Sequence, residues 1–247
     1  MQKFDMGAAW SDARLLLSSY GGLVSAVAGV FVLLPQFVMG IVAPPPPAVP
    51  QGATVDQVVA VWQPWFWQIF PYQLVGGLLT LIGTLSIMRL WLTRTSISVA
   101  EAIKGSLFIL IPVFVAQLLT SIAMFFGFMA LIIPGLFLAA RFSVVAAAAA
   151  DQRARGPIGY IAASWNLTKG NALSLIFYYL LIFVAVAVVY MLAIMVLGGL
   201  VSWIPSIGPV LGVLVESALT TVLTVVILAV TTGVYRQLVS IADQPRY

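Results

Sequence analysis

The sequence of 247 residues contains no cysteine and no histidine, and these two absences remove several kinds of chemistry. Without cysteine there are no disulfide bonds, no thiolate nucleophiles and no thiolate metal ligands. Without histidine there is no imidazole metal ligand and no imidazole acid–base catalyst. Few hydrolytic mechanisms remain, so we expect a protein that is not an enzyme and that binds no metal and no cofactor.

Charged side chains are also scarce. Only 7% of the residues are charged and 62% are hydrophobic, whereas a water-soluble domain carries roughly 25% charged residues. Such a chain cannot cover its surface with polar groups, which predicts an all-α integral membrane protein. The formal net charge is +4, but no basic face exists outside the loops that flank the membrane, so we expect no nucleic-acid partner.

Apolar runs long enough to cross a bilayer, about 20 residues each, occur six times. The predicted spans are residues 15–42, 71–92, 106–132, 136–151, 172–197 and 209–238, which pair as three hairpins in one membrane domain, 1–247. Three shorter segments, 54–70, 98–104 and 157–169, are predicted to be amphipathic helices at the membrane interface. Ser98 and Glu101 form a capping-box pattern, and Pro157 suits the first position of a helix.

The positions of the basic residues predict the orientation. The expected outer connections, residues 43–70, 133–135 and 198–208, contain no lysine or arginine. Ten of the eleven basic residues fall in the terminal segments, in the two alternate loops or at the adjoining helix ends, and Arg141 is the exception. Since lysine and arginine are enriched in cytoplasmic loops, both termini are predicted to be cytoplasmic.

The segment 54–70 carries three tryptophans, Trp62, Trp65 and Trp67. Tryptophan is enriched at the headgroup level of a membrane, so we expect this segment to lie flat on the outer membrane surface. An aromatic cluster that binds a ligand is the alternative interpretation. Four prolines precede the segment, at residues 44–47, and predict an extended chain.

Two ionisable residues, Arg141 and Glu216, lie well inside the predicted spans. A charge at mid-membrane costs about 2.5–3.5 kcal/mol on insertion scales. Arg141 lies six residues after Gly135 and Glu216 lies seven after Pro209, which at about 1.5 Å per residue gives depths of about 9 and 10 Å. We therefore predict that the two side chains pair, or share a water-filled pocket with other polar groups.

Hydroxyl side chains follow Glu216 along the same predicted helix. Thr220 and Thr224 repeat at intervals of four residues, and Ser217 flanks them. This polar ridge is expected to face the interior of the bundle. It is either a contact that holds helices together or the wall of a polar cavity for a proton, an ion or a lipid headgroup.

The loop and short helix after the fourth span are basic. Arg153, Arg155 and Lys169, together with Trp165, are expected to contact anionic lipid headgroups or a partner protein. Each basic residue near an anionic membrane surface contributes about 1 kcal/mol. Ordinary anchoring on the cytoplasmic side is the alternative.

A run of about 40 residues carries a recognisable pattern. Ile133-Pro134-Gly135 precedes Arg141, Gly156-Pro157 follows, and S-W-N-L-T-K-G-N occupies residues 164–171. This pattern resembles the YciC-like family, also described as the membrane domain of glycerophosphoryl diester phosphodiesterases. The resemblance implies a multi-pass bacterial inner-membrane protein. Relatives with a fused phosphodiesterase barrel need histidine and metal-binding acids, so the resemblance implies no such activity here.

Two functions follow as hypotheses. The first is a non-enzymatic bacterial inner-membrane protein that organises membrane lipids or partner proteins in the envelope. The alternative is a transporter of a small solute or lipid that uses a polar cavity at Arg141 and Glu216. Substrate flux that is lost in a Glu216→Gln variant would favour the transporter.

Overall fold

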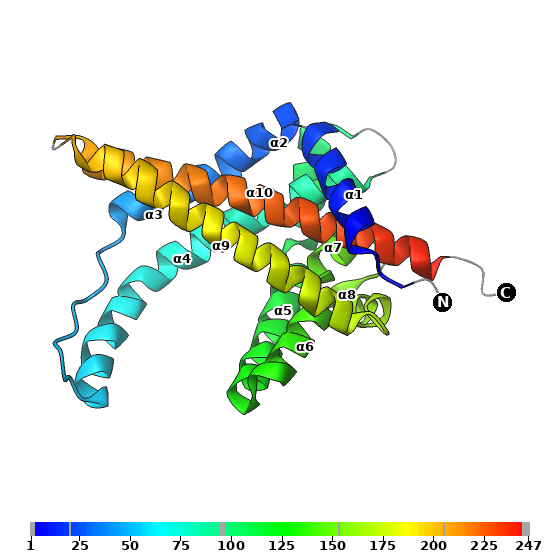
Figure 1. The fold of residues 1–247 in the computed structure, drawn as a ribbon, viewed down its shortest axis with the longest axis horizontal. Coiled ribbons are helices and arrows are strands. Elements are labelled where there is room, and N and C mark those ends of the chain that lie inside the picture. Colours follow the sequence, from blue (N-terminus) through cyan, green and yellow to red (C-terminus); the bar gives the residue numbers. More distant parts are fainter. Residues whose placement is uncertain (1–2, 20, 94–96, 153, 205, 244–247) are drawn as a thin grey trace.

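The structure is a computed structural model that describes residues 3–19, 21–93, 97–152, 154–204 and 206–243. The chain is 85% helical, and the described residues contain no strand. Six helical stretches are long and apolar enough to cross a membrane. The prediction of an all-α membrane protein with six spans is therefore confirmed (Figure 1).

The helices follow one another in three hairpins. The first consists of α1 (Met6–Ser19), α2 (Gly21–Ala28), the π-helical turn η1 (Gly29–Leu33), α3 (Leu34–Val42) and α4 (Val55–Leu92). The second consists of α5 (Val99–Ala130), α6 (Ile132–Phe142) and α7 (Val145–Ala150). The short α8 (Gly156–Leu167) leads to the third, α9 (Ala172–Ser202) and α10 (Gly208–Ala242).

Two of the three predicted interfacial helices are not separate elements. The segment 54–70 forms the first half of α4, a continuous helix of 38 residues that runs through Pro64 and Pro71. The segment 98–104 forms the start of α5, which continues through Gly105. The capping box at Ser98 and Glu101 is present, but it opens a helix of 32 residues. Only 157–169 matches a separate short helix, α8.

The turn of the second hairpin also differs from the prediction. Residues 133–135, expected as the connection, lie inside α6, and the chain reverses at Leu131, whose backbone is extended. Pro134 is tolerated because the first turn of a helix has no intrahelical partner for its N–H groups. Gly135 lets the hairpin close, since a Cβ atom at this position would overlap the ring of Phe128.

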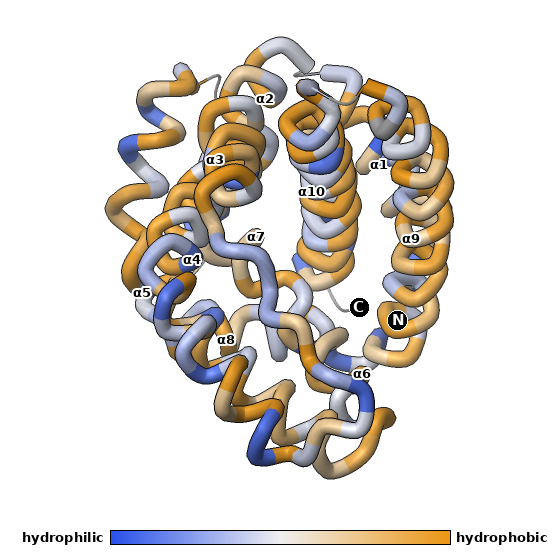
Figure 2. Tube along the Cα trace, turned by 90° about the vertical axis from the view of Figure 1, so that its left-hand side faces the viewer, coloured by the Kyte–Doolittle hydropathy of each residue, from blue (hydrophilic) through white to orange (hydrophobic). Residues whose placement is uncertain are grey.

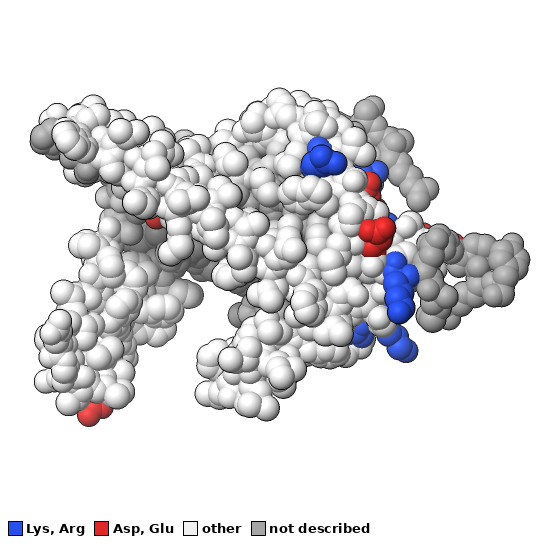
Figure 3. Space-filling model, viewed as in Figure 1, with Lys and Arg blue, Asp and Glu red and all other residues white. Residues whose placement is uncertain are grey.

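The two ends of the molecule differ in charge. The N-terminus, the end of α10 and the α7–α8 connection lie at one end (Figure 1), and the lysines and arginines visible in Figure 3 gather there. We call this end, which carries Lys3, Arg155, Lys169 and Arg236, the basic end. The start of α4, the α5–α6 turn and the α9–α10 turn form the other end, which we call the open end.

The buried core lies toward the basic end, where α1, α4, α7 and α10 meet. Its large side chains with almost no exposure include Ile87, Val144, Tyr235 and Leu238. At the open end the hairpins point in different directions, with hollows between them in the space-filling view (Figure 3). Figure 2, seen from the open end, shows α9 and α5 on different sides of the molecule and α9 almost entirely apolar.

Candidate functional site

Arg141 is held by aromatic rings. It lies at the end of α6 and is only 4% exposed. Its guanidinium carbon lies 4.1 Å from the ring centroid of Trp165 in α8 and 5.9 Å from that of Phe137. Its Nε is buried without a hydrogen bond, and no carboxylate among the described residues forms an ion pair with it. Cation–π contacts of this kind stabilise by about 0.5–2 kcal/mol.

The backbone of Arg141 is held by the same short helix. The helix breaks after Phe142, and the last carbonyls of a helix need partners from elsewhere. Ser164 Oγ donates to the Arg141 carbonyl at 2.8 Å, and Thr168 Oγ1 donates to it at 3.3 Å. Three residues of the S-W-N-L-T segment therefore fix α8 against the junction of α6 and α7.

The predicted ion pair of Arg141 with Glu216 does not occur among the contacts of the described residues, and a pocket shared by the two residues stays a prediction. Glu216 is exposed on α10, and its carboxylate accepts a long hydrogen bond of 3.5 Å from the Tyr190 hydroxyl. The count of residues from each outer turn does not fix the direction of either side chain. Arg141 turns toward α8 because the break in α6 lets this helix pack against it.

The polar ridge that follows Glu216 is satisfied within its own helix. Thr220 and Thr224 each donate at 2.8 Å to the carbonyl four residues earlier. Ser217 is 5% exposed, so only part of the ridge is buried. Threonine hydroxyls commonly form such bonds inside helices, and they need no ligand to do so.

The predicted basic surface is only partly described. Arg155 and Lys169 are exposed at the basic end, and Arg153 lies outside the described residues. Trp165, at 37% exposure, covers Arg141 with its ring and leaves an edge at the surface. The main contact of Trp165 is therefore with the buried guanidinium of Arg141, and not with the membrane surface.

The outer tryptophans lie on the first half of α4. Trp62 and Trp65 meet edge to face at 5.2 Å between centroids. The indole N–H of Trp65 donates to the Pro44 carbonyl at 3.1 Å, which ties α4 to the proline-rich connection. Trp67 is 62% exposed. These contacts give two of the three tryptophans a role in packing at the open end.

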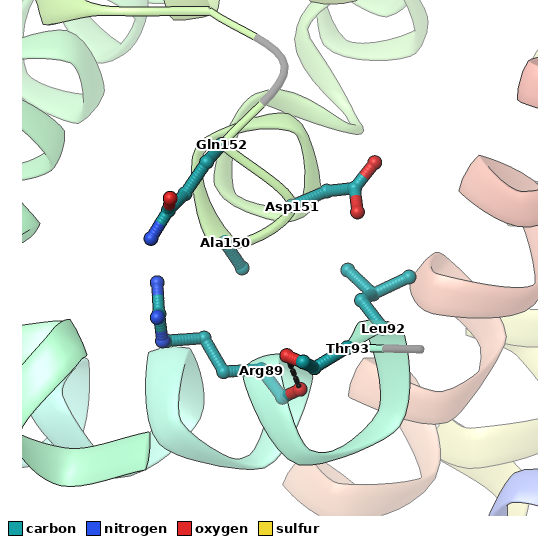
Figure 4. A pocket seen from close by; sticks show the side chains of 6 residues that line it. All are labelled: Arg89, Leu92, Thr93, Ala150, Asp151 and Gln152. Carbon is teal, nitrogen blue, oxygen red and sulfur yellow. Dashed lines mark hydrogen bonds between the residues drawn. The ribbon is translucent and has the colours of Figure 1, made fainter. Parts of the chain in front are cut away.

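A second arginine site lies at the basic end, in the last turn of α4. A cavity of about 240 Å³ is lined by Arg89, Leu92, Thr93, Ala150, Asp151 and Gln152. Figure 4 shows the Arg89 guanidinium and the Gln152 side chain facing each other, while the neighbouring Asp151 side chain points away from this pair. The cavity therefore places a cation, an amide and a carboxylate around one small space.

Gln152 is the direct partner of Arg89. Two sets of N–H donors cannot face each other, so the amide carries its oxygen toward the guanidinium. In that orientation the oxygen accepts from Nη1 at 2.8 Å and from Nη2 at 3.1 Å. Gln152 has a φ of 55°, in the left-handed region, which is uncommon for residues other than glycine.

The neighbouring contacts hold this site in place. The Tyr235 hydroxyl of α10 donates to Asp151 Oδ2 at 2.7 Å. The guanidinium of Arg89 lies against the backbone of α5 at Gly105, where a Cβ atom would collide with it. Residues from α4, α5 and α10 thus meet at the end of α7.

The Arg89 site is not among the predicted sites, although the sequence contains a signal for it. Arg89 falls inside the predicted span 71–92, and an arginine within a span is itself an indication of a functional or paired charge. Gly105, which directly follows the predicted helix 98–104, provides space for the Arg89 guanidinium. The left-handed backbone at Gln152 had no glycine or asparagine to indicate it.

Together the six spans and the absence of any strand among the described residues define a multi-pass α-helical membrane protein. No group of three or more acidic residues able to hold a metal ion occurs within the described ranges. Comparison with family models, with curated proteins and with solved structures finds no match to this chain. The YciC-like resemblance therefore stays a prediction based on the motif.

Proposed function

We propose that this protein is a non-enzymatic bacterial inner-membrane protein that organises membrane lipids, alone or with partner proteins. The observation that carries this proposal is the contrast between a packed, basic end and an open, apolar end. The YciC-like pattern at residues 133–171 supports the location in a bacterial inner membrane.

The apolar surface of the hairpins supports a role with lipids. Only 6% of the most apolar stretch of α9 and 17% of that of α5 is buried inside the molecule. Lipid tails are as apolar as leucine, so hydrophobic surface in a bilayer does not by itself drive helices together. The hollows between the hairpins are then filled by acyl chains, or by a partner that brings specific contacts.

The charge at the basic end supports an interaction with headgroups. The positive-inside rule assigns this end to the cytoplasm, where anionic lipids attract each exposed basic residue by about 1 kcal/mol. Arg155 and Lys169 are exposed there.

We favour lipid organisation over transport because the two residues of the predicted polar cavity each have another contact. Arg141 contacts Trp165, and Glu216 contacts Tyr190. No contact of these residues favours a polar pathway across the membrane.

Lipid analysis tests the proposal. The full chain is extracted with its surrounding bilayer in polymer-bound discs, and the lipids are compared with the bulk membrane by mass spectrometry. We expect at least one lipid class to be enriched several-fold. A composition equal to that of the bulk membrane, with solute flux in proteoliposomes that Glu216→Gln abolishes, would overturn the proposal in favour of transport.

A further inference from the structure

We propose that the Arg89 cavity binds the headgroup of a zwitterionic phospholipid that carries a primary ammonium. The phosphodiester would contact Arg89 and Gln152, and the ammonium would lie beside Asp151. This inference rests on the proposed function in lipid organisation, and it names the class of lipid and the residues that select it.

The cavity lies at the level where headgroups are found. Arg89 is in the last turn of α4, and the helix ends at Leu92. The capping residue Thr93 lines the cavity. An apolar span that ends at this point brings the cavity to the boundary between acyl chains and headgroups.

The guanidinium of Arg89 is suited to a phosphate. Its Nε is buried without a hydrogen bond, and its two other nitrogens share one neutral amide oxygen. Arginine binds phosphate through two parallel hydrogen bonds, and bonds to an ionised acceptor are roughly twice as strong as neutral ones. A phosphate would therefore displace the Gln152 oxygen.

Gln152 can contribute to the same phosphate. A half-turn of its amide replaces the oxygen by the NH₂ group, which donates hydrogen bonds. The left-handed backbone of Gln152 directs its side chain toward α4, as Figure 4 shows. The amide is therefore an acceptor for Arg89 without lipid and a donor to phosphate with lipid.

The carboxylate of Asp151 is placed to bind the positively charged ammonium of the headgroup. Asp151 lies on the side of the cavity away from Arg89 (Figure 4) and accepts from the Tyr235 hydroxyl through Oδ2. A carboxylate has about four lone-pair sites, so an ammonium can bind while the existing bonds remain. A purely anionic headgroup would be repelled by Asp151.

The size of the cavity is suited to a headgroup. A volume of about 240 Å³ is smaller than the roughly 300–1,000 Å³ of sites for drug-sized ligands. The acyl chains would remain outside, and Leu92 and Ala150 provide an apolar wall for the glycerol carbons.

Native mass spectrometry of the full chain tests the inference. The protein is reconstituted in discs that contain equal amounts of phosphatidylethanolamine, phosphatidylcholine and phosphatidylglycerol, and the lipids retained after release are counted. We expect one phosphatidylethanolamine to be retained at least tenfold over the other two, because choline cannot donate hydrogen bonds and glycerol has no positive charge. Arg89→Gln should lower this retention at least tenfold.

The variant Asp151→Asn distinguishes a change in headgroup recognition from a loss of the folded structure. Removing the negative charge should shift the preference from phosphatidylethanolamine to phosphatidylglycerol, an inversion that unfolding cannot produce. If Arg89→Gln fails to fold, Arg89→Lys can replace it. Lysine keeps the positive charge but cannot form the bidentate hydrogen bonds, so retention of phosphatidylethanolamine should weaken by a smaller factor. Asp56→Asn is the matched control, since it removes an exposed carboxylate in the first turn of α4, at the open end and away from the cavity, and should leave the lipid preference unchanged.

The outcomes distinguish the two proposals. If the wild-type protein enriches a lipid that Arg89→Gln and Arg89→Lys retain equally, the function stands and this site is wrong. Preferential retention of phosphatidylglycerol by the wild-type protein also overturns the site. If the wild-type protein enriches no lipid, both proposals fail.

Discussion

Two arginines of this protein, the half-buried Arg89 and the buried Arg141, have different partners for their guanidinium groups. Each has an Nε that is buried without a hydrogen bond. Arg89 binds the amide of Gln152 at the edge of a cavity, whereas Arg141 lies on the ring of Trp165. An amide can be displaced by a stronger acceptor, but a ring that fills its own space cannot.

Arg89 and Arg141 also differ in how firmly their surroundings hold them. Arg141 is fixed through both its side chain and its carbonyl, because Trp165 covers the guanidinium and Ser164 binds the backbone. Arg89 lies in an unbroken helix, and its surroundings include empty volume. Arg141 therefore stabilises the fold, and Arg89 is available to a ligand.

The largest effect is expected from Trp165→Ala. This change leaves the buried Arg141 charge with only the more distant Phe137 ring, and removing one partner of a buried charge costs about 3–5 kcal/mol. We expect the free energy of unfolding in detergent micelles, titrated with dodecyl sulfate and followed by circular dichroism, to fall by about 3 kcal/mol. Trp203→Ala is the control, because Trp203 is 86% exposed.

A double-mutant cycle shows whether the loss in unfolding free energy arises from the contact between the Trp165 ring and the Arg141 charge. Arg141→Met removes the charge at similar length, so Trp165→Ala should cost less in its presence. We expect a coupling of about 1–2 kcal/mol between the two substitutions. Strictly additive losses would mean that the guanidinium gains nothing from the ring.

An intermediate effect is expected from Gly105→Ala, which tests the position of Arg89. The new Cβ atom collides with the guanidinium, and overpacking costs about 1–3 kcal/mol. Alanine in place of glycine inside a helix otherwise stabilises by up to about 1 kcal/mol. We expect a net loss of about 1 kcal/mol in the same unfolding titration.

Gly77→Ala provides the matched control for this substitution. Gly77 lies inside α4, and an added Cβ atom there meets nothing within 4 Å. This variant should be as stable as the wild-type protein or slightly more stable. Equal gains from both alanines would show that Arg89 does not rest on α5.

The spans and hairpins could be predicted because they depend on the length of apolar runs, whereas the arginine sites depend on local backbone geometry. The break between Phe142 and Val145 has no proline or glycine to indicate it, yet it decides where Arg141 points. The continuity of α4 past Pro71 was missed for the opposite reason. Proline suggested a boundary, but a long helix tolerates it when neighbouring groups satisfy the freed carbonyl.

A smaller effect is expected from Ser164→Ala. The Ser164 hydroxyl is fully buried and donates to the Arg141 carbonyl, but Thr168 remains as a second, longer donor. We expect a loss of about 0.5–1 kcal/mol, the lower half of the usual net range for one hydrogen bond, because the second donor remains. Ser25→Ala is the control, since the exposed Ser25 hydroxyl bonds only within its own helix.

The smallest effect is expected from Glu216→Gln, and it tests the claim that Arg141 is held by a ring and not by an acid. Glu216 is exposed and has one long contact, with Tyr190, that an amide oxygen can also accept. The free energy of unfolding should therefore change by no more than about 0.5 kcal/mol. A loss of about 3–5 kcal/mol, as expected for a broken buried pair, would show that the carboxylate does compensate Arg141, and the contrast between the two arginines would then disappear.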